Sequence, residues 1–299
     1  MQPIGIAPPG YRGRIAPSPT GYLHLGHART FWTAQERALA QKGCLVLRNE
    51  DLYPVHCQAH FVTAMIEDLK WLGLAWQEGP DCGGPFGPYA QRQRHALYLA
   101  AFETLRAGGW VYPCVCSRQD VRRALRAPHA RDDEPIYPGT CRPTAALADG
   151  PPQNSRAVTD GFANPRPNKP INWRFKVTPG EIVSFVDAHY GPQQFTGGQD
   201  FGNFVVWRYD QWPAYQLAVV VDDALMRITE VVRGADLLLS TARQILLYRA
   251  LNYPPPQFCH CPLMVDATGQ RLAKRHGALS LRTLRAEGLI AEEARARWR

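Results

Sequence analysis

The sequence predicts an α/β fold built on a parallel, doubly wound sheet, because strand-like and helix-like segments alternate along it. Tyr11–Ala16 is a short strand-like segment that leads into a Pro/Gly turn. Leu25–Gln41 is Ala-rich with apolar residues at helical spacing, and Gly43 follows it. Cys44–Arg48 is then a compact apolar run of the kind found in buried parallel strands. This order indicates the first strand–helix–strand unit of the sheet.

Two further amphipathic helices are expected in the first part of the chain. Apolar residues recur at helical spacing over Phe61–Leu72 and again over Tyr89–Ala107. Gly108 and Gly109 end the second of these segments. Residues 1–109 are therefore expected to form the first half of the parallel core.

The alternation stops between Trp110 and about Phe195, and we expect this stretch to be a small subdomain inserted into the core. It contains three of the eight cysteines and many prolines. Its part from Gly150 to Pro170 is polar and rich in Pro and Gly, which predicts a loop. Ile171–Phe185 alternates between apolar and polar residues, as strands do.

Residues 196–299 are expected to form the second half of the core, where the alternation resumes. Tyr215–Asp223 fits either a helix or a strand. Two further strands are expected, at Phe204–Arg208 and Met226–Val232. Two further helices are expected at Thr241–Leu251 and Thr283–Arg297, and the second of these is strongly basic.

Composition and charge narrow the functional classes. The chain has 34 Lys and Arg against 26 Asp and Glu, a net charge of +8, which favours an anionic partner such as a nucleic acid. It has no apolar run long enough for a membrane span, and its first ten residues lack the pattern of a signal peptide. We therefore expect a cytoplasmic protein. In such a protein, the eight cysteines favour free thiols or a metal site over disulfides.

Two histidines flank a glycine where the first strand turns into the first helix, in His24-Leu25-Gly26-His27. A helix N-terminus presents backbone N–H groups and a positive partial charge, so it binds anions such as a triphosphate. Histidines three apart can share a face of the first turn and donate hydrogen bonds to phosphate oxygens. Gly26 leaves room for a flat base. By themselves, these residues also fit two surface histidines at a helix start.

Five segments, in order along the chain, resemble the glutamyl-tRNA synthetases of the class I aminoacyl-tRNA synthetase family. Ala16–Gly21 followed by His24–His27 resembles the HIGH motif, and Leu47–Asp51 resembles the next segment, usually written L-R-I-E-D. Val219–Met226 and Val232–Asp236 resemble later segments of that family. The last segment resembles the KMSKS loop, and it is Gln270–Ala278.

The resemblance implies a class I synthetase catalytic domain with a Rossmann-like parallel sheet. Its two halves correspond to residues 1–109 and 196–299, and the second half contains the KMSKS-like loop and a short C-terminal helix. Residues 110–195 correspond to an inserted, zinc-containing, acceptor-type α+β subdomain.

The resemblance also implies an ATP site that uses Mg²⁺-bound ATP. It assigns ATP binding to His24, Gly26, His27 and Lys274, and catalysis to the two histidines and Lys274. An ammonium on the KMSKS loop stabilises the departing pyrophosphate. The loop differs from the family pattern at three positions, where a Lys and two Ser residues are replaced by Arg271, Ala273 and Arg275. The positive charge is kept, so we expect activity, although a hydroxyl contact is lost.

The amino acid that the resemblance implies is glutamate. A substrate with two carboxylates and one ammonium needs two cations and one anion, and the Arg fork matches a carboxylate. The family pattern places Arg14 and Ser18 at the substrate, Glu50 at its α-amino group, and Tyr215 and Arg233 on the far side. The same set includes the loop residues Ile15, Ala16 and Pro17. Taken singly, Arg14 also fits a strand flank and Glu50 a surface ion pair.

Three cysteines in the inserted stretch, Cys114, Cys116 and Cys141, are typical of part of a tetrahedral zinc site. The spacing alone leaves the fourth ligand open. The candidates between Cys116 and Cys141 are His129, Asp132, Asp133, Glu134 and Tyr137. The coordination chemistry of zinc favours His129 among them. The resemblance implies Tyr137, with one structural Zn²⁺; free buried thiols are the alternative. A second cluster, Cys259-His260-Cys261, sits in an expected strand, where neighbouring residues point to opposite faces, so we expect core packing there.

Only 24 residues follow Arg275, too few for the anticodon-binding region that full-length relatives carry after this loop. The chain thus resembles the glutamyl-Q tRNA(Asp) synthetases, the truncated branch of the family. That resemblance implies activation of glutamate without tRNA, and its transfer to the queuosine base at the wobble position of tRNA(Asp), by a monomer. Three alternatives stay open: a minimal enzyme that charges a tRNA 3′ end, an inactive tRNA-binding module, and a related nucleotidyltransferase acting on another acid.

Overall fold

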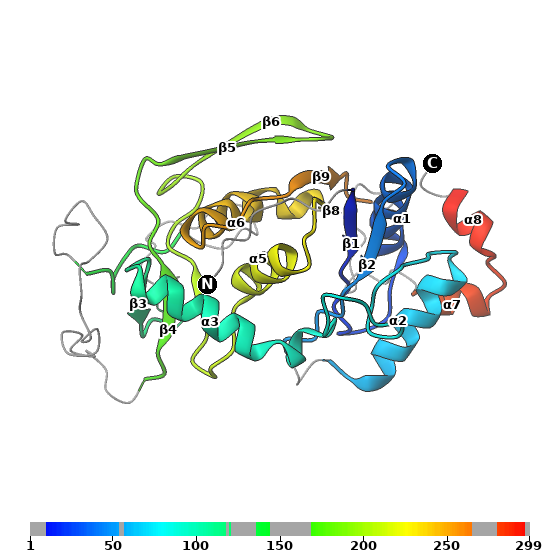
Figure 1. The fold of residues 1–299 in the computed structure, drawn as a ribbon, viewed down its shortest axis with the longest axis horizontal. Helices are drawn as coiled ribbons and strands as arrows, with labels where there is room; N and C mark the ends of the chain where they lie inside the picture. Colours follow the sequence, from blue (N-terminus) through cyan, green and yellow to red (C-terminus); the bar gives the residue numbers. More distant parts are fainter. Residues whose placement is uncertain are drawn as a thin grey trace.

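The computed structural model describes residues 10–53, 57–117, 120, 136–143, 169–264 and 280–296. Two parallel strand pairs form the centre of the molecule (Figure 1). In the first pair, β1 (Arg12–Ile15) and β2 (Cys44–Leu47) are joined through helix α1 (Leu25–Ala40). In the second, β8 (Glu230–Gly234) and β9 (Gln257–Cys261) are joined through α6 (Leu238–Ala250). The expected parallel α/β architecture is therefore confirmed.

The two pairs meet along β1 and β8. The amide of Thr229, just before β8, donates a hydrogen bond to the carbonyl of Arg12 at 2.9 Å. Further along both strands, the Arg14 side chain reaches the carbonyl of Val232. The spatial order is thus β2, β1, β8, β9, and the connections run outward in opposite directions from the middle. In open α/β sheets, this reversal opens a crevice at the carboxyl ends of the two central strands, where ligands bind.

Further helices pack beside these strands, and one of them differs from expectation. α2 (Ala59–Trp71) and α5 (Tyr215–Leu225) are regular helices, which resolves the ambiguity of the second segment in favour of a helix. The helix expected from residue 89 is wrong at its start, because α3 begins only at His95 (His95–Ala107), after a 3-10 turn at Gln91–Gln93. The reason is that the chain there follows the end of β2: Asn49 accepts a hydrogen bond from the amide of Gln91.

Strand Phe204–Arg208 was expected to belong to the parallel core, and this prediction is wrong. The observed strand β7 (Val205–Trp207) pairs antiparallel with β4 (Asn172–Phe175), which also pairs antiparallel with β3 (Val111–Cys114). A second antiparallel unit is the hairpin of β5 (Ile182–Asp187) and β6 (Gly191–Thr196), at the top of Figure 1. The hairpin joins the parallel core where Asp187 pairs with Phe258 of β9. The boundaries at residues 110 and 195 remain a prediction.

The single helix expected over residues 283–297 is also wrong. Two short helices occupy this region, α7 (Leu281–Ala286) and α8 (Ala291–Ala296). Gly288 lies between them with a φ of +97°, a left-handed conformation that ends a helix and that glycine adopts at little cost. The loop expected between residues 150 and 170 falls largely outside the described residues.

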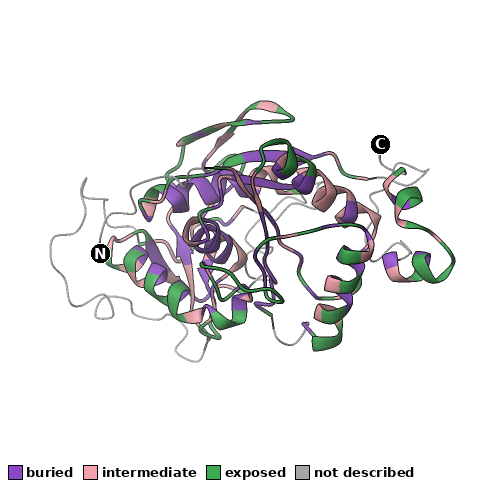
Figure 2. Cartoon of the chain, turned by 45° about the vertical axis from the view of Figure 1, so that its right-hand side comes forward, coloured by how far each residue is buried: buried purple, intermediate pink, exposed green. Residues whose placement is uncertain are grey.

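The core consists of two apolar clusters, of which one runs from β2, β8 and β9 to the antiparallel sheet and the other packs α1 and α2 against β1 and β2. Figure 2 shows the buried residues in purple. Among them are charged side chains, of which Arg48 and Asp222 are fully buried. Asp222 accepts hydrogen bonds from Arg94, Tyr98 and Gln91 at 2.6–3.0 Å. This buried polar network ties α3 to α5. None of the described helices is both long enough and apolar enough to span a membrane.

Candidate active site

A cavity of about 380 Å³ opens at the carboxyl ends of β1 and β8, the position that the strand order predicts for a ligand. It brings together residues from five places in the chain. Most of the residues expected at the ATP and glutamate sites line it: Arg14, Ala16, Pro17, Ser18, His24, Gly26, His27, Glu50, Tyr215 and Arg233. Their roles remain predictions, but segments more than 200 residues apart in sequence converge on one cavity.

Ile15 is the exception among the expected glutamate-pocket residues. Its side chain is completely buried and packs in the core with Leu23 and Leu47. Its carbonyl accepts a hydrogen bond from the amide of Arg48 at 2.9 Å, which holds β1 beside the end of β2. Ile15 therefore shapes the cavity from beneath, and its side chain does not line it.

The two histidines lie at the very start of α1. His24 is the N-cap residue, and its Nδ1 accepts a hydrogen bond from the amide of Gly26 at 3.1 Å. The Nδ1 of His27 in turn accepts from the amide of His24 at 3.4 Å, and the two ring centroids lie 3.7 Å apart. Because both Nδ1 atoms act as acceptors, the neutral rings carry their protons on Nε2. Both rings then provide an N–H donor of the kind that binds phosphate oxygens.

A buried cation, Arg14, and a buried anion, Glu50, line the cavity. Glu50 accepts a hydrogen bond from the fully buried Arg48 at 2.9 Å. Burial raises the pKa of Glu50, and the positive charge of Arg48 opposes that rise. Arg14 donates to the carbonyl of Val232 at 2.6 Å and lies 3.6 Å from Asp223, which also binds Arg48. One network therefore holds both pocket charges in place.

The opposite wall consists of Tyr215 and Arg233. Tyr215 is the first residue of α5, and burial raises its pKa, so the hydroxyl stays protonated and can donate a hydrogen bond. Arg233 is buried near the end of β8, where it donates to Thr241 at 2.6 Å and to His260 at 3.1 Å. Burial, together with the nearby charge of Arg14, lowers the pKa of Arg233, so nearby negative charge only partly compensates its guanidinium. An anionic ligand would complete that compensation.

Lys274, with Arg271, Ala273 and Arg275, lies outside the described residues. The described residues on both sides of it lie at the cavity. Met264 lines it, and Ser280 forms an antiparallel bridge with His24. The amide of Leu281 donates to the carbonyl of Leu23 at 2.7 Å. The described residues that flank the segment predicted to hold Lys274 therefore lie at the cavity on one side and next to His24 on the other.

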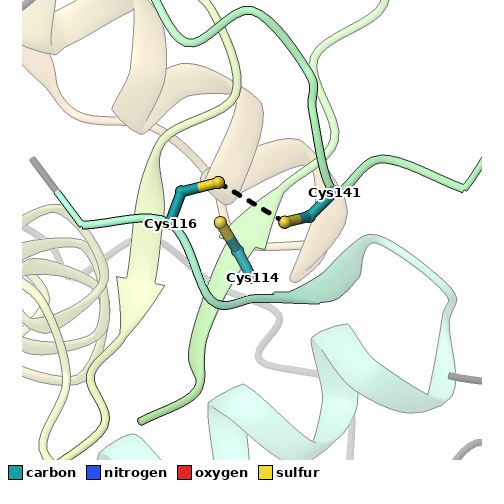
Figure 3. A group of neighbouring side chains, drawn as sticks. All are labelled: Cys114, Cys116 and Cys141. Carbon is teal, nitrogen blue, oxygen red and sulfur yellow. Dashed lines mark hydrogen bonds between the residues drawn. The ribbon is translucent and has the colours of Figure 1, made fainter. Parts of the chain in front are cut away.

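The three cysteines of the inserted stretch lie together, with their sulfurs pointing toward one another (Figure 3). All three Sγ atoms lie within 4.8 Å of one another. The Tyr137 hydroxyl lies 3.4 Å and 3.5 Å from the sulfurs of Cys114 and Cys116, and it accepts a hydrogen bond from the amide of Cys141. Three thiols and one phenol form a compact set of four donors that fits a tetrahedral Zn²⁺. His129 and the acidic residues at 132–134 lie outside the described residues.

Arg174 adds a positive charge at this cluster. Its Nε donates to the sulfur of Cys114 at 3.3 Å, and its guanidinium lies over the Tyr137 ring at 4.0 Å. A cation at this position offsets the negative charge of thiolates around a divalent metal. Cys259 and Cys261, by contrast, are buried in the apolar core, which confirms the core packing expected for this strand.

Sequence reasoning missed the residues that support the cavity from behind. Arg48, Asp222 and Asp223 lie in segments that resembled family motifs, but no role was assigned to them. Asp187 binds the ring of His260, 73 positions away, and no local pattern signals such a contact. Only the folded arrangement reveals these partners.

The fold and the cavity define the class of the protein: an α/β enzyme whose switch-point cavity combines a His-x-Gly-His helix start with buried charges of both signs. Residues 11–294 match the family described as tRNA synthetases class I (E and Q), catalytic domain. The chain therefore belongs to the class I aminoacyl-tRNA synthetase family.

Two relatives are similar over almost the whole chain. A glutamyl-Q tRNA(Asp) synthetase from Symbiobacterium thermophilum is 49% identical over 94% of the chain and 83% of its own length. One from Nitratidesulfovibrio vulgaris is 45% identical over 94% of the chain and 82% of its own length. Among solved structures, a glutamate tRNA ligase from Elizabethkingia meningosepticum in complex with its amino acid has a TM-score of 0.73 and 28% identity over 94% of the chain. The chain spans 53% of that longer protein.

Proposed function

We propose that this chain activates glutamate with ATP, without tRNA, and transfers it to the queuosine base at the wobble position of tRNA(Asp). It acts as a cytoplasmic monomer. The observation that carries the proposal is the charge pattern of the cavity, where buried Arg14 and Arg233 flank Glu50. Two cations and one anion complement the two carboxylates and one ammonium of glutamate. The two relatives with the name of this activity support the choice of acceptor.

The chemistry has two steps. An oxygen of the glutamate α-carboxylate attacks the α-phosphate of Mg²⁺-bound ATP, and the bond to pyrophosphate breaks to give glutamyl-adenylate. A hydroxyl of the queuosine base then attacks the acyl carbonyl, loses its proton and displaces AMP. His24 and His27 donate N–H groups to the phosphate oxygens, and Lys274 stabilises the departing pyrophosphate.

The first step can be tested by ATP–pyrophosphate exchange. We expect exchange that depends on glutamate, occurs without tRNA, and is far slower with glutamine or aspartate. Glutamine lacks the second carboxylate, and the buried cation opposite it would remain unpaired. Exchange that requires tRNA, or that is equally fast with all three amino acids, would contradict the proposal.

Lys274→Ala should lower the rate of activation by about 100-fold or more, because one preorganised electrostatic contact to developing charge has an effect of this order. The KM for glutamate should change little, since Lys274 is assigned to the phosphates. Measuring kcat and both KM values by exchange separates these effects. Lys70→Ala, on the exposed side of α2, is the control. A comparable loss in kcat and in glutamate affinity would reject the assigned role.

We also propose that Cys114, Cys116, Tyr137 and Cys141 hold one structural Zn²⁺. Zinc at such a site would cross-link β3 to the following segment and supply folding stability, with no part in the transfer chemistry. We expect about one zinc per chain after dialysis, measured by metal mass spectrometry, and close to none in Cys141→Ser. Cys82→Ser, an exposed thiol elsewhere, should keep the metal. Equal zinc content in both variants would rule the site out.

A further inference from the structure

A hydrogen-bonded relay of three buried side chains runs from the β5–β6 hairpin to the cavity. Asp187 at the end of β5 accepts from Nδ1 of His260 on β9 at 2.6 Å. The Nε2 atom of the same ring lies 3.1 Å from Nε of Arg233, which lines the cavity. Asp187, His260 and Arg233 are all at most 5% exposed, so water does not compete for these bonds.

The order of donors along the relay follows from its end groups. An arginine Nε can only donate, so Nε2 of His260 must accept and must carry no proton. Nδ1 then carries the ring proton and donates it to Asp187. Burial and the nearby charge of Arg233 lower the pKa of His260 to about 4, which keeps the ring neutral. Arg14 adds to this effect, and Asp187 opposes it.

Asp187 is itself firmly held. Its Oδ1 accepts from the amides of His189 and Tyr190 in the hairpin turn, at 3.0 and 2.9 Å. Its Oδ2 accepts from the amide of His260 as well as from the ring. Although burial opposes ionisation, these hydrogen bonds lower the pKa of Asp187, which therefore stays a carboxylate. The hairpin thus provides a fixed acceptor behind the histidine.

We propose that Asp187 and His260 are positioning residues that set the affinity and selectivity for glutamate by fixing the Arg233 guanidinium. With Nε on His260 and Nη2 on Thr241, the orientation of the planar fork is determined, and its other N–H groups remain to bind a carboxylate. This inference rests on the proposed function, because it takes glutamate as the ligand of Arg233. It extends the site to the β5–β6 hairpin, which does not line the cavity.

Asp187→Asn tests the relay with almost no change in shape. The amides of His189 and Tyr190 would keep the asparagine oxygen at the Oδ1 position, where the amide of His260 can also reach it at 3.3 Å. The NH₂ group would then face Nδ1 and force the ring proton onto Nε2. His260 would then present an N–H to Arg233 Nε, which would lose its acceptor. We expect the KM for glutamate to rise by about 10- to 100-fold, the effect of losing one hydrogen bond to a charged group. The KM for ATP should stay unchanged, kcat should change less than the KM, and discrimination against glutamine should weaken.

Asp200→Asn is the matched control, because Asp200 caps the other end of the hairpin by accepting from the amide of Thr196. It should leave the KM for glutamate unchanged. If Asp187→Asn does not fold, Thr241→Val replaces it, since valine keeps the volume and removes the oxygen that accepts from Arg233 Nη2. Its expected rise in the KM for glutamate is again about 10- to 100-fold, because this hydrogen bond also involves a charged group. If the variant that is tested is folded and its KM for glutamate equals that of the wild type, the proposal is overturned.

Imidazole ¹⁵N chemical shifts give a readout that does not depend on catalysis. Wild-type His260 should carry its proton on Nδ1, and Asp187→Asn should move it to Nε2. A proton on Nε2 in the wild type would overturn the relay even if glutamate is activated. A different outcome is that Nδ1 is protonated but the wild type catalyses no glutamate-dependent exchange. This result would reject the proposed function and the role of the relay in glutamate selection. The hydrogen bonds of the relay would still stand.

Discussion

Arg233→Leu is expected to reduce kcat/KM for glutamate by roughly 30-fold to several thousand-fold, the range that follows from about 2–5 kcal/mol for removing one partner of a buried charge pair. The reason is that the substrate carboxylate would then enter a buried site without its cation. The effect should fall mainly on the KM for glutamate, while the KM for ATP stays close to the wild-type value. Exchange kinetics with each substrate varied in turn measure both.

The same substitution should leave the protein folded. Burial lowers the pKa of Arg233, so its charge is costly to bury, and an apolar side chain removes that cost. Arg249→Leu on α6, whose side chain is about half exposed, is the control and should keep full activity. An Arg233→Leu variant that is folded and as active as the wild type would show that the glutamate carboxylate binds elsewhere.

Asp222→Ala is expected to lower the free energy of unfolding by about 3–5 kcal/mol, because it would leave buried Arg94 without its ion-pair partner. Tyr98 and Gln91 would lose their acceptor as well. Denaturant unfolding followed by circular dichroism measures the change. Asp222 is completely buried and lines no part of the cavity, so the loss should appear first as instability.

Glu103→Ala on α3 is the control for this second substitution. Glu103 pairs with Arg106 at the surface, where both side chains are more than 40% exposed. Exposed pairs of this kind contribute little, so a change below about 0.5 kcal/mol is expected. Equal effects of Asp222→Ala and Glu103→Ala would contradict the view that the buried network holds α3 against α5.

The parallel core could be predicted from sequence because its signals are local. Apolar runs at Cys44–Arg48 and helical spacing over Leu25–Gln41 are properties of neighbouring residues, and the structure has a strand and a helix there. The sequence also predicts a strand at Phe204–Arg208, but the sheet that it predicts for this strand is the wrong one. Pairing with β4 depends on contacts across more than 30 positions, which the periodicity of one segment does not encode.

The cavity shows the same limit. Most of the residues assigned through family motifs converge on it, yet Ile15 lies beneath its surface, because alternate residues of a strand face opposite sides. The contact between Asp187 and His260 escaped prediction, since a buried aspartate and a buried histidine in separate strands have no shared sequence pattern. Such supporting contacts depend on tertiary structure alone.

The proposed acceptor of glutamate is a base in the anticodon loop. The most direct test of this proposal is to incubate the chain with ATP, labelled glutamate and queuosine-containing tRNA(Asp), digest the tRNA, and locate the label. We expect label on the fragment with the wobble nucleoside, and none on tRNA(Asp) that lacks queuosine. Label on the 3′-terminal adenosine of tRNA(Glu), with the anticodon loop of tRNA(Asp) unlabelled, would contradict the proposal and identify the chain as a minimal charging enzyme.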